Sequence, residues 1–214
     1  IIAGKGVLVT NIQNTLKDKK QIDVTTLPFN FEYQTIVPVD AIANPYYSFP
    51  EEIKVGNLVS QGKIQGTIKN PQAALKWTIP AASVDSVGRV SSGGELLFNN
   101  QTILINNTQL KTNQGQINLT GISNLKNKQW QIAVDGQNFV ISPFIAEFCR
   151  QQVQDFCPYL KDRYININQA NIELAGNLDQ LNLNNLQGNT NLALNVDQGN
   201  VTFRSNLDAG KIQG

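Results

Sequence analysis

Hydrophobic and polar residues alternate with a period of two along most of the chain. In residues 164–168, Ile165 and Ile167 are interleaved with asparagines. Because side chains on a β-strand point alternately to opposite faces, such a segment predicts a strand with one apolar and one polar face. The same alternation recurs at residues 116–119, 130–134, 181–184, 191–196 and 200–204. The chain is therefore predicted to be mainly β.

Polar dipeptides separate these segments and predict turns, because Asn, Asp, Gly and Pro favour turn conformations. These pairs are Asn70-Pro71, Asn99-Asn100, Asn106-Asn107, Asp135-Gly136, Gln187-Gly188 and Gln198-Gly199.

A motif of glycine, a polar–apolar–polar step and a second glycine recurs along the chain. It occurs at residues 62–66 and 210–214, with looser copies at 115–121 and 172–176. Glycine within or at the end of a strand marks a bulge or a bend, so we expect a curved sheet. Irregular repetition of this kind is typical of elongated or solenoid-like sheets rather than of a compact sandwich.

Residues 27–50 break the alternation. They contain four prolines, Pro28, Pro38, Pro45 and Pro50, together with six aromatic residues. Proline has no N–H group for the hydrogen bonds of a sheet, which argues against a central strand. We predict short edge strands and loop here, with the aromatic residues packed over the end of a sheet; ligand binding by these aromatics is the less favoured reading.

Residues 142–163 contain the one helix that the sequence predicts. Ser142 is a suitable N-cap and Pro143 occupies the favoured first helical position. An apolar stripe follows at three- and four-residue steps: Ile145, Cys149, Val153, Phe156 and Leu160. Pro158 should kink the helix, or end it and start a second short one. The helix either caps an apolar sheet face or acts as a plug in a groove.

Four segments follow from these patterns. Residues 1–54 hold N-terminal strands and the proline-rich loop, 55–141 a repetitive β segment, 142–163 the helical insertion and 164–214 a second repetitive β segment. We expect one continuous domain. Because the chain starts at Ile1, contains no Met and ends within a repeat, we also expect it to be part of a longer protein.

Amides supply most of the polarity of this chain. Only 15% of its residues are charged, whereas it contains 27 Asn and 21 Gln. Uncharged amides avoid repulsion between neighbouring strands, and their alternation with aliphatic residues favours ordered β-structure over disorder or aggregation. The net charge of +1 argues against a nucleic-acid-binding surface. There is no apolar run of about 18 residues to form a membrane-spanning helix.

Catalytic chemistry is poorly represented. The chain contains no His, which removes Ser-His-Asp and Cys-His catalysis and histidine metal sites. Glu51-Glu52 is the only adjacent carboxylate pair, and neighbours on a strand point to opposite faces. We therefore predict no enzymatic activity, no cofactor and no metal.

The sequence does not decide whether the two cysteines are free thiols or form a disulfide. Cys149 and Cys157 on an unbroken helix would lie about 12 Å apart, beyond the ~7 Å limit for the Cα atoms of a disulfide. If the chain turns back near Pro158, a disulfide closing a helical hairpin becomes feasible. A disulfide would fit an extracytoplasmic setting.

Residues 62–71 resemble the repeat of the TamB group of AsmA-like envelope proteins, and residues 115–137, 172–194 and 195–214 resemble further turns of the same repeat. The resemblance covers about residues 55–214, with 142–163 as an insertion. It implies a long sheet folded lengthwise into a half-pipe, or β-taco, with an apolar inner surface. It also implies a place in the periplasm or an equivalent intermembrane space, and an inner-membrane anchor outside this sequence.

The same resemblance implies a function. Members move phospholipid between membranes, or assist outer-membrane protein assembly beside Omp85-type barrels, which they contact through other regions. Acyl chains would bind an apolar strand face at about 0.8 kcal/mol per buried methylene. For each candidate groove residue, a place in a closed core is the alternative. The candidates are Ile64, Ile68, Ile103, Ile105, Ile117, Leu119, Trp130, Ile132, Val134, Ile165, Ile167, Ile172, Leu174, Leu192, Leu194, Val201 and Phe203.

A β-solenoid adhesin or secreted surface protein is the second hypothesis, because such proteins are also rich in Asn, Gly and alternating aliphatic residues. Solenoids favour evenly spaced rungs, and the intervals in this chain vary. The lipid-conducting or scaffolding function is therefore preferred.

Overall fold

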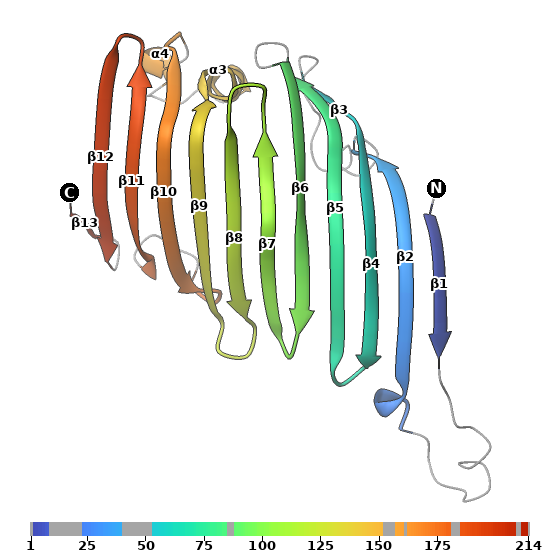
Figure 1. The fold of residues 1–214 in the computed structure, drawn as a ribbon. Helices are drawn as coiled ribbons and strands as arrows, with labels where there is room; N and C mark the ends of the chain where they lie inside the picture. Colours follow the sequence, from blue (N-terminus) through green and yellow to red (C-terminus); the bar gives the residue numbers. More distant parts are fainter. Residues whose placement is uncertain are drawn as a thin grey trace, which may run out of the picture.

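The computed structural model describes residues 2–8, 23–39, 53–84, 88–151, 157–160, 162–180, 185–208 and 211–213. Within these residues the chain forms a single open antiparallel sheet of 13 strands, together with short helices (Figure 1). The prediction of a mainly β chain is confirmed. The predicted strand at residues 181–184 lies outside the described residues.

Most strands pair with the strands that precede and follow them in the sequence, so the sheet is a long meander; β3 instead pairs with the upper part of β5. The strands are β1 (Ile2–Leu8), β2 (Pro28–Pro38), β3 (Ile53–Val55), β4 (Asn57–Thr67), β5 (Pro71–Val84), β6 (Gly88–Asn99), β7 (Thr102–Lys111), β8 (Gln116–Asn124), β9 (Gln129–Val140), β10 (Ile165–Asn177), β11 (Gln187–Val196), β12 (Gly199–Asp208) and β13 (Lys211–Gln213). The helices are η1 (Val24–Thr26), α3 (Ser142–Gln151) and α4 (Cys157–Leu160).

Strand register places the alternating aliphatic residues on one side of the sheet. Leu75 pairs with Leu96, and Leu96 pairs in turn with Ile105. Further along, Ile132 pairs with Leu174. Directly paired residues point to the same face of a sheet. We call this side the apolar face and the opposite, amide-rich side the polar face.

β-Bulges keep the alternation in phase where the sequence departs from a strict period of two. Between Ile105 and Thr108 the register shifts, and Asn107 has a φ of 50°. One extra residue at that point returns the following aliphatic residues to the apolar face, whereas a continuous strand would turn them to the polar face. The same extra residue shifts the pairing of β7 with β6 at Gly93/Glu95, and further shifts occur at Ile79/Ala82 and Ile167/Gln169.

Three predicted turns are wrong. Asn106-Asn107 forms the bulge in β7, and Asp135-Gly136 lies within β9. Gln187-Gly188 begins β11. Gly136 pairs with Ala170 of β10, and a Cβ atom at Gly136 would lie 3.3 Å from the Cβ of Ala170. Asn70-Pro71, Asn99-Asn100 and Gln198-Gly199 do lie at hairpin turns.

The prediction of edge strands and loop for residues 27–50 is also wrong in its first part. β2 is an 11-residue strand between β1 and β4, paired along its whole length with β4. Pro28 and Pro38 are its first and last residues, so no interior hydrogen bond of the strand is lost. Pro45 and Pro50 lie outside the described residues.

The predicted helix is divided in two, as the position of Pro158 indicated. α3 and α4 are separate, and Pro158 occupies the first turn of α4, where a missing N–H group is tolerated. The prediction of Ser142 as N-cap is wrong, because the carbonyl of Ile141 accepts the first helical N–H groups, from Phe144 and Ile145. The Ser142 hydroxyl instead hydrogen-bonds the backbone of Ile165 in β10.

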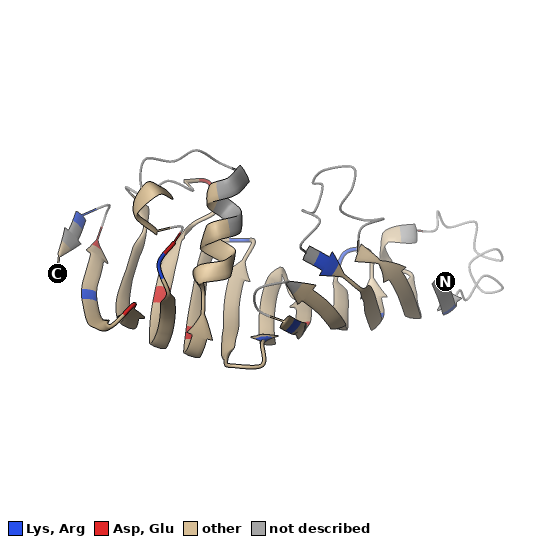
Figure 2. Ribbon diagram, turned by 90° about the horizontal axis from the view of Figure 1, so that it is seen from above, with Lys and Arg blue, Asp and Glu red and all other residues tan. Residues whose placement is uncertain are grey.

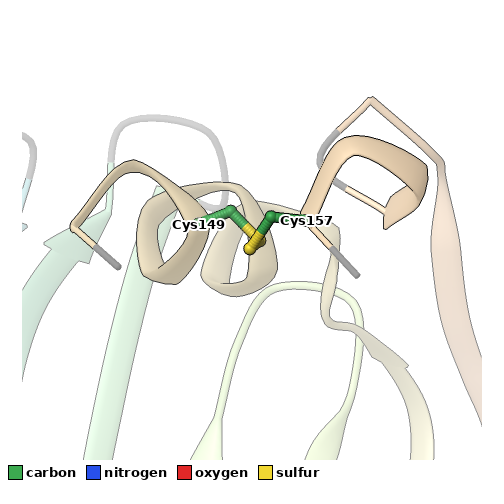
Figure 3. The surroundings of a disulfide bond; sticks show 2 residues. All are labelled: Cys149 and Cys157. Carbon is green, nitrogen blue, oxygen red and sulfur yellow. A yellow bond between two sulfur atoms is a disulfide. The ribbon is translucent and has the colours of Figure 1, made fainter. Parts of the chain in front are cut away.

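A disulfide joins Cys149 of α3 to Cys157 of α4, with their Cα atoms 5.3 Å apart (Figure 3). The two cysteines are separated by 8 positions in the sequence. Closing a loop of that length in the unfolded chain corresponds to about 2.5 kcal/mol of stabilisation. The helical insertion leaves the sheet continuous, because β9 and β10 pair directly on either side of it.

The sheet is thinly covered. The whole chain has a solvent-accessible surface of 14445 Å², whereas a compact monomer of this mass would expose about 9,800 Å². Figure 2 shows a curved sheet with α3 and α4 on one side of it. In the described part of the chain the buried apolar residues are Val90, Phe139, Val140, Cys157, Ile165 and Ala170. Of these, Phe139, Val140, Cys157 and Ile165 lie in or beside the helical hairpin, whereas Val90 is in β6 and Ala170 is in the interior of β10.

Gly62 lies where neighbouring strands approach too closely to leave room for a side chain. A Cβ atom there would lie 2.7 Å from both the carbonyl oxygen of Ala74 and the ring of Tyr33. We expect Gly62→Ala to lower the free energy of unfolding by about 1–3 kcal/mol, because the backbone of β5 must shift. Gly199→Ala is the control, since its nearest atom is 3.5 Å away. Urea midpoints that fall equally in both variants would contradict this account.

Asp23 joins η1 to the turn between β4 and β5. Its carboxylate accepts hydrogen bonds from Lys69, at 2.8 Å, and from Thr25, which lower the pKa of Asp23 from 3.8 to about 2. A lowered folded-state pKa adds stability above pH ~4 that is lost as the pH falls toward 2. We expect Lys69→Gln to return the pKa of Asp23 toward 3.8, followed by the carboxyl shift in NMR. Lys128→Gln should leave it near 2; the same value in both variants would refute the role of Lys69.

Candidate functional site

The predicted groove residues lie, with one exception, on the apolar face of the sheet. Ile68 is the exception, because it is in the turn between β4 and β5 and is 61% exposed. On the apolar face are Ile64 on β4, Ile103 and Ile105 on β7, Ile117 and Leu119 on β8, Trp130, Ile132 and Val134 on β9, Ile165, Ile167, Ile172 and Leu174 on β10, Leu192 and Leu194 on β11, and Val201 and Phe203 on β12.

These residues form rows that cross the strands. One row crosses the sheet from β2 to β12, and every member pairs directly with the next. Its members are Tyr33, Gly62, Leu75, Leu96, Ile105, Gly121, Ile132, Leu174, Gly188 and Leu207. The apolar face is therefore a continuous surface across the sheet and not a set of isolated patches.

Exposure of this face varies along the sheet. Near the helical hairpin Ile165 is 5% exposed, whereas Phe203 on β12 is 45% exposed and Ile64 on β4 is 37% exposed. Water-accessible aliphatic side chains on both flanks of a curved sheet provide a surface that apolar ligands can reach.

A hollow of about 280 Å³ lies on the apolar face at the lower end of β7–β9, opposite the end that carries the helices. It is lined by Ile103, Ile105, Trp130, Ile132 and Leu178, among others. Gly121 lies in its floor and contributes no side chain to fill it. The volume is near the lower limit for ligand sites, about 300 Å³, and would suit one end of an apolar chain.

Two polar atoms beside this hollow lack hydrogen-bond partners within the described structure. They are the hydroxyl oxygen of Ser123 and the indole nitrogen of Trp130, which belong to directly paired residues. An unsatisfied buried polar atom costs about 1–3 kcal/mol. The site thus combines apolar walls with uncompensated polar groups.

A second hollow, of about 590 Å³, lies on the polar face between β1 and β6. It is lined by charged residues that include Lys63, Lys76 and Glu95. Lys76 lies 2.6 Å from Glu95, and its hydrogen bond lowers the pKa of the Glu95 carboxyl below 4.5. The sheet is therefore hollowed on opposite faces in its two halves. No cluster of potential metal ligands occurs among the described residues.

Sequence reasoning missed parts of both faces. Phe31, Tyr33 and Leu96 extend the apolar face, and the period-two pattern of residues 29–37 could have found the first two had the prolines not been weighted more heavily. Leu97, Leu104 and Ile122 form an exposed apolar row on the polar face. That row is invisible in the sequence, because its members meet only through strand pairing.

Comparison with known proteins found no matching family model, no similar curated protein and no similar solved structure. The helices of the described residues are too short or too polar to span a bilayer.

The Ser123 hydroxyl, which lacks a hydrogen-bond partner within the described structure, can be tested by mutation. We expect Ser123→Ala to be neutral or to stabilise the protein by up to about 1 kcal/mol, because it removes a buried atom without a partner. Ser142→Ala is the matched control and should cost about 1 kcal/mol, since it removes hydrogen bonds to Ile165. The measurement is urea unfolding. A larger loss in Ser123→Ala than in Ser142→Ala would show that the Ser123 hydroxyl is satisfied.

Proposed function

We propose that this chain is a non-catalytic segment of a TamB-like envelope protein whose apolar face carries the acyl chains of phospholipids. The observation that supports it best is the unbroken apolar row from β2 to β12, which remains partly exposed. A soluble protein normally covers such a face with a second layer. Here α3 and α4 lie at only one end of the strands (Figure 1).

The dimensions suit this function. Neighbouring strands are about 4.8 Å apart, so a row that crosses from β2 to β12 is roughly 45 Å long. Apolar contact is non-directional and contributes about 0.8 kcal/mol per methylene. An acyl chain could therefore slide from one strand to the next without breaking directional bonds, as transport requires.

The proposal includes the finer geometry and setting that the sequence resemblance implies. The curved sheet would be folded lengthwise into a half-pipe, with the apolar face inside. The segment would lie in the periplasm or an equivalent intermembrane space, held by an anchor and working with an Omp85-type barrel through regions outside this sequence. The disulfide between Cys149 and Cys157 favours an oxidising compartment. A scaffolding role in outer-membrane protein assembly would use the same surface.

The second candidate, a secreted surface protein or adhesin, receives less support. Its solenoid form requires parallel rungs that stack in order, whereas the described strands pair antiparallel in successive hairpins. The disulfide is compatible with either function.

Leu119 and Thr120 provide a matched pair of sites for a test. They are neighbours on β8, with Leu119 on the apolar face and Thr120 exposed on the polar face. We expect Leu119→Asp to reduce co-purified phospholipid at least fivefold by native mass spectrometry, because burying a carboxylate against acyl chains is unfavourable. Thr120→Asp should retain the wild-type amount.

Circular dichroism checks that both variants remain folded, and Ile167→Asp repeats the test on β10. Equal phospholipid in Leu119→Asp and Thr120→Asp would contradict the proposal. Wild-type protein free of phospholipid after detergent-free purification from a bacterial host would also contradict it, and would favour the surface-protein alternative.

A further inference from the structure

Described contacts attach the start of α3 to the upper end of the apolar face. The ring of Phe144 in α3 stacks on Phe139 of β9, with centroids 5.7 Å apart. The Ser142 hydroxyl hydrogen-bonds the backbone of Ile165 at the start of β10. These contacts hold α3; they do not involve α4.

The side chains of the sheet that lie beside α3 are among the most deeply buried ones of the apolar face. Phe139 is 2% exposed and Ile165 is 5% exposed, whereas Val201 and Phe203, on the uncovered part of the same face, are 46% and 45% exposed. The hairpin therefore determines how much of the upper end of the apolar face meets water.

A disulfide links the two helices. α4 has only 4 residues, far fewer than the 12 or so that make a helix marginally stable alone. Its Tyr159 is 75% exposed, whereas Cys157 is 5% exposed. The one buried side chain of α4 is thus the cysteine that binds α3 (Figure 3).

We propose that the Cys149–Cys157 disulfide is a redox-sensitive clasp that keeps the helical hairpin closed over the upper end of the apolar face. Its reduction releases α4, loosens α3 and uncovers the face around Phe139 and Ile165. The inference rests on the proposed function in one respect, because the uncovered surface is the one assigned to acyl chains.

The chemistry requires a dithiol reductant. One thiolate attacks a sulfur of the disulfide, forming a mixed disulfide and releasing the other cysteine as thiolate. The second thiol of the reductant then displaces the remaining cysteine. The protein gains two electrons and two protons as two thiols, and the reductant becomes a disulfide. Cys149 is partly buried whereas Cys157 is 5% exposed, so we expect the dithiol to attack the Cys149 sulfur.

Hydrogen exchange followed by mass spectrometry tests the clasp on the 214-residue chain, oxidised and after treatment with dithiothreitol. Reduction is verified by the mass of the two added hydrogens. We expect amides of α3 and of the strand ends at Val140 and Ile165 to exchange at least tenfold faster after reduction. Amides of the lower part of β7 and β8 should keep their protection.

The double variant Cys149→Ser/Cys157→Ser is the control for the reductant. It should exchange like the reduced wild type and should not respond to dithiothreitol. Phe144→Ala, with the disulfide intact, should loosen α3 but leave α4 attached to it. Unchanged exchange in α3 after verified reduction would overturn the clasp. Faster hydrogen exchange throughout the sheet would overturn the clasp as well, since the disulfide would then stabilise the whole fold and not the hairpin alone.

Phospholipid content separates this inference from the proposed function. Faster exchange in α3 with no phospholipid in either redox state would support the clasp while contradicting the lipid function. Phospholipid that is bound equally in both states, with α3 loosened, would overturn the regulation of lipid binding. We expect at least a twofold difference in bound phospholipid between the oxidised and reduced protein.

Discussion

The structure depends on one constraint, which is that the alternation of side chains must stay in phase across the paired strands. A slip of one residue would turn the aliphatic side chains of a strand to the polar face. Bulges prevent this where the sequence departs from a strict alternation, as between Ile105 and Thr108. Hydrophobic burial and hydrogen-bonded register thus reinforce each other, and the result is one apolar face that is continuous from β2 to β12.

That face is unusual because so little covers it. The buried apolar residues of the described part are concentrated near the α3–α4 hairpin, and the flanks at β4 and β12 remain accessible. Stability must therefore come largely from strand pairing and from side-chain contacts within a single layer. An accessible apolar face of this kind is a liability for a free domain and an advantage for a surface that handles acyl chains. The amide-rich polar face offsets the liability by keeping the other side hydrated.

Much of the fold followed from local chemistry. Alternating Ile, Leu and Val with Asn and Gln predicted the strands, and Ser142, Pro143 and Pro158 located the helical insertion and its break. The groove residues other than Ile68 lie together on one face, because alternation gives each strand two faces and the register aligns the apolar faces of paired strands. The errors came from giving short signals too much weight: the prolines of β2 lie at its ends, and Asn106-Asn107 forms a bulge instead of a turn.

By itself the sequence determined the strand content, the two-faced character of each strand and the absence of histidine chemistry. Only the tertiary structure decided which strands are neighbours, that β2 lies inside the sheet, that Cys149 meets Cys157, and that Leu97, Leu104 and Ile122 form a row on the polar face. The physical reason is the distance along the sequence over which each interaction acts. Side-chain alternation and helix breaking act within a few residues, whereas register, bulge position and the meeting of two cysteines depend on backbone hydrogen bonds and packing between separate segments.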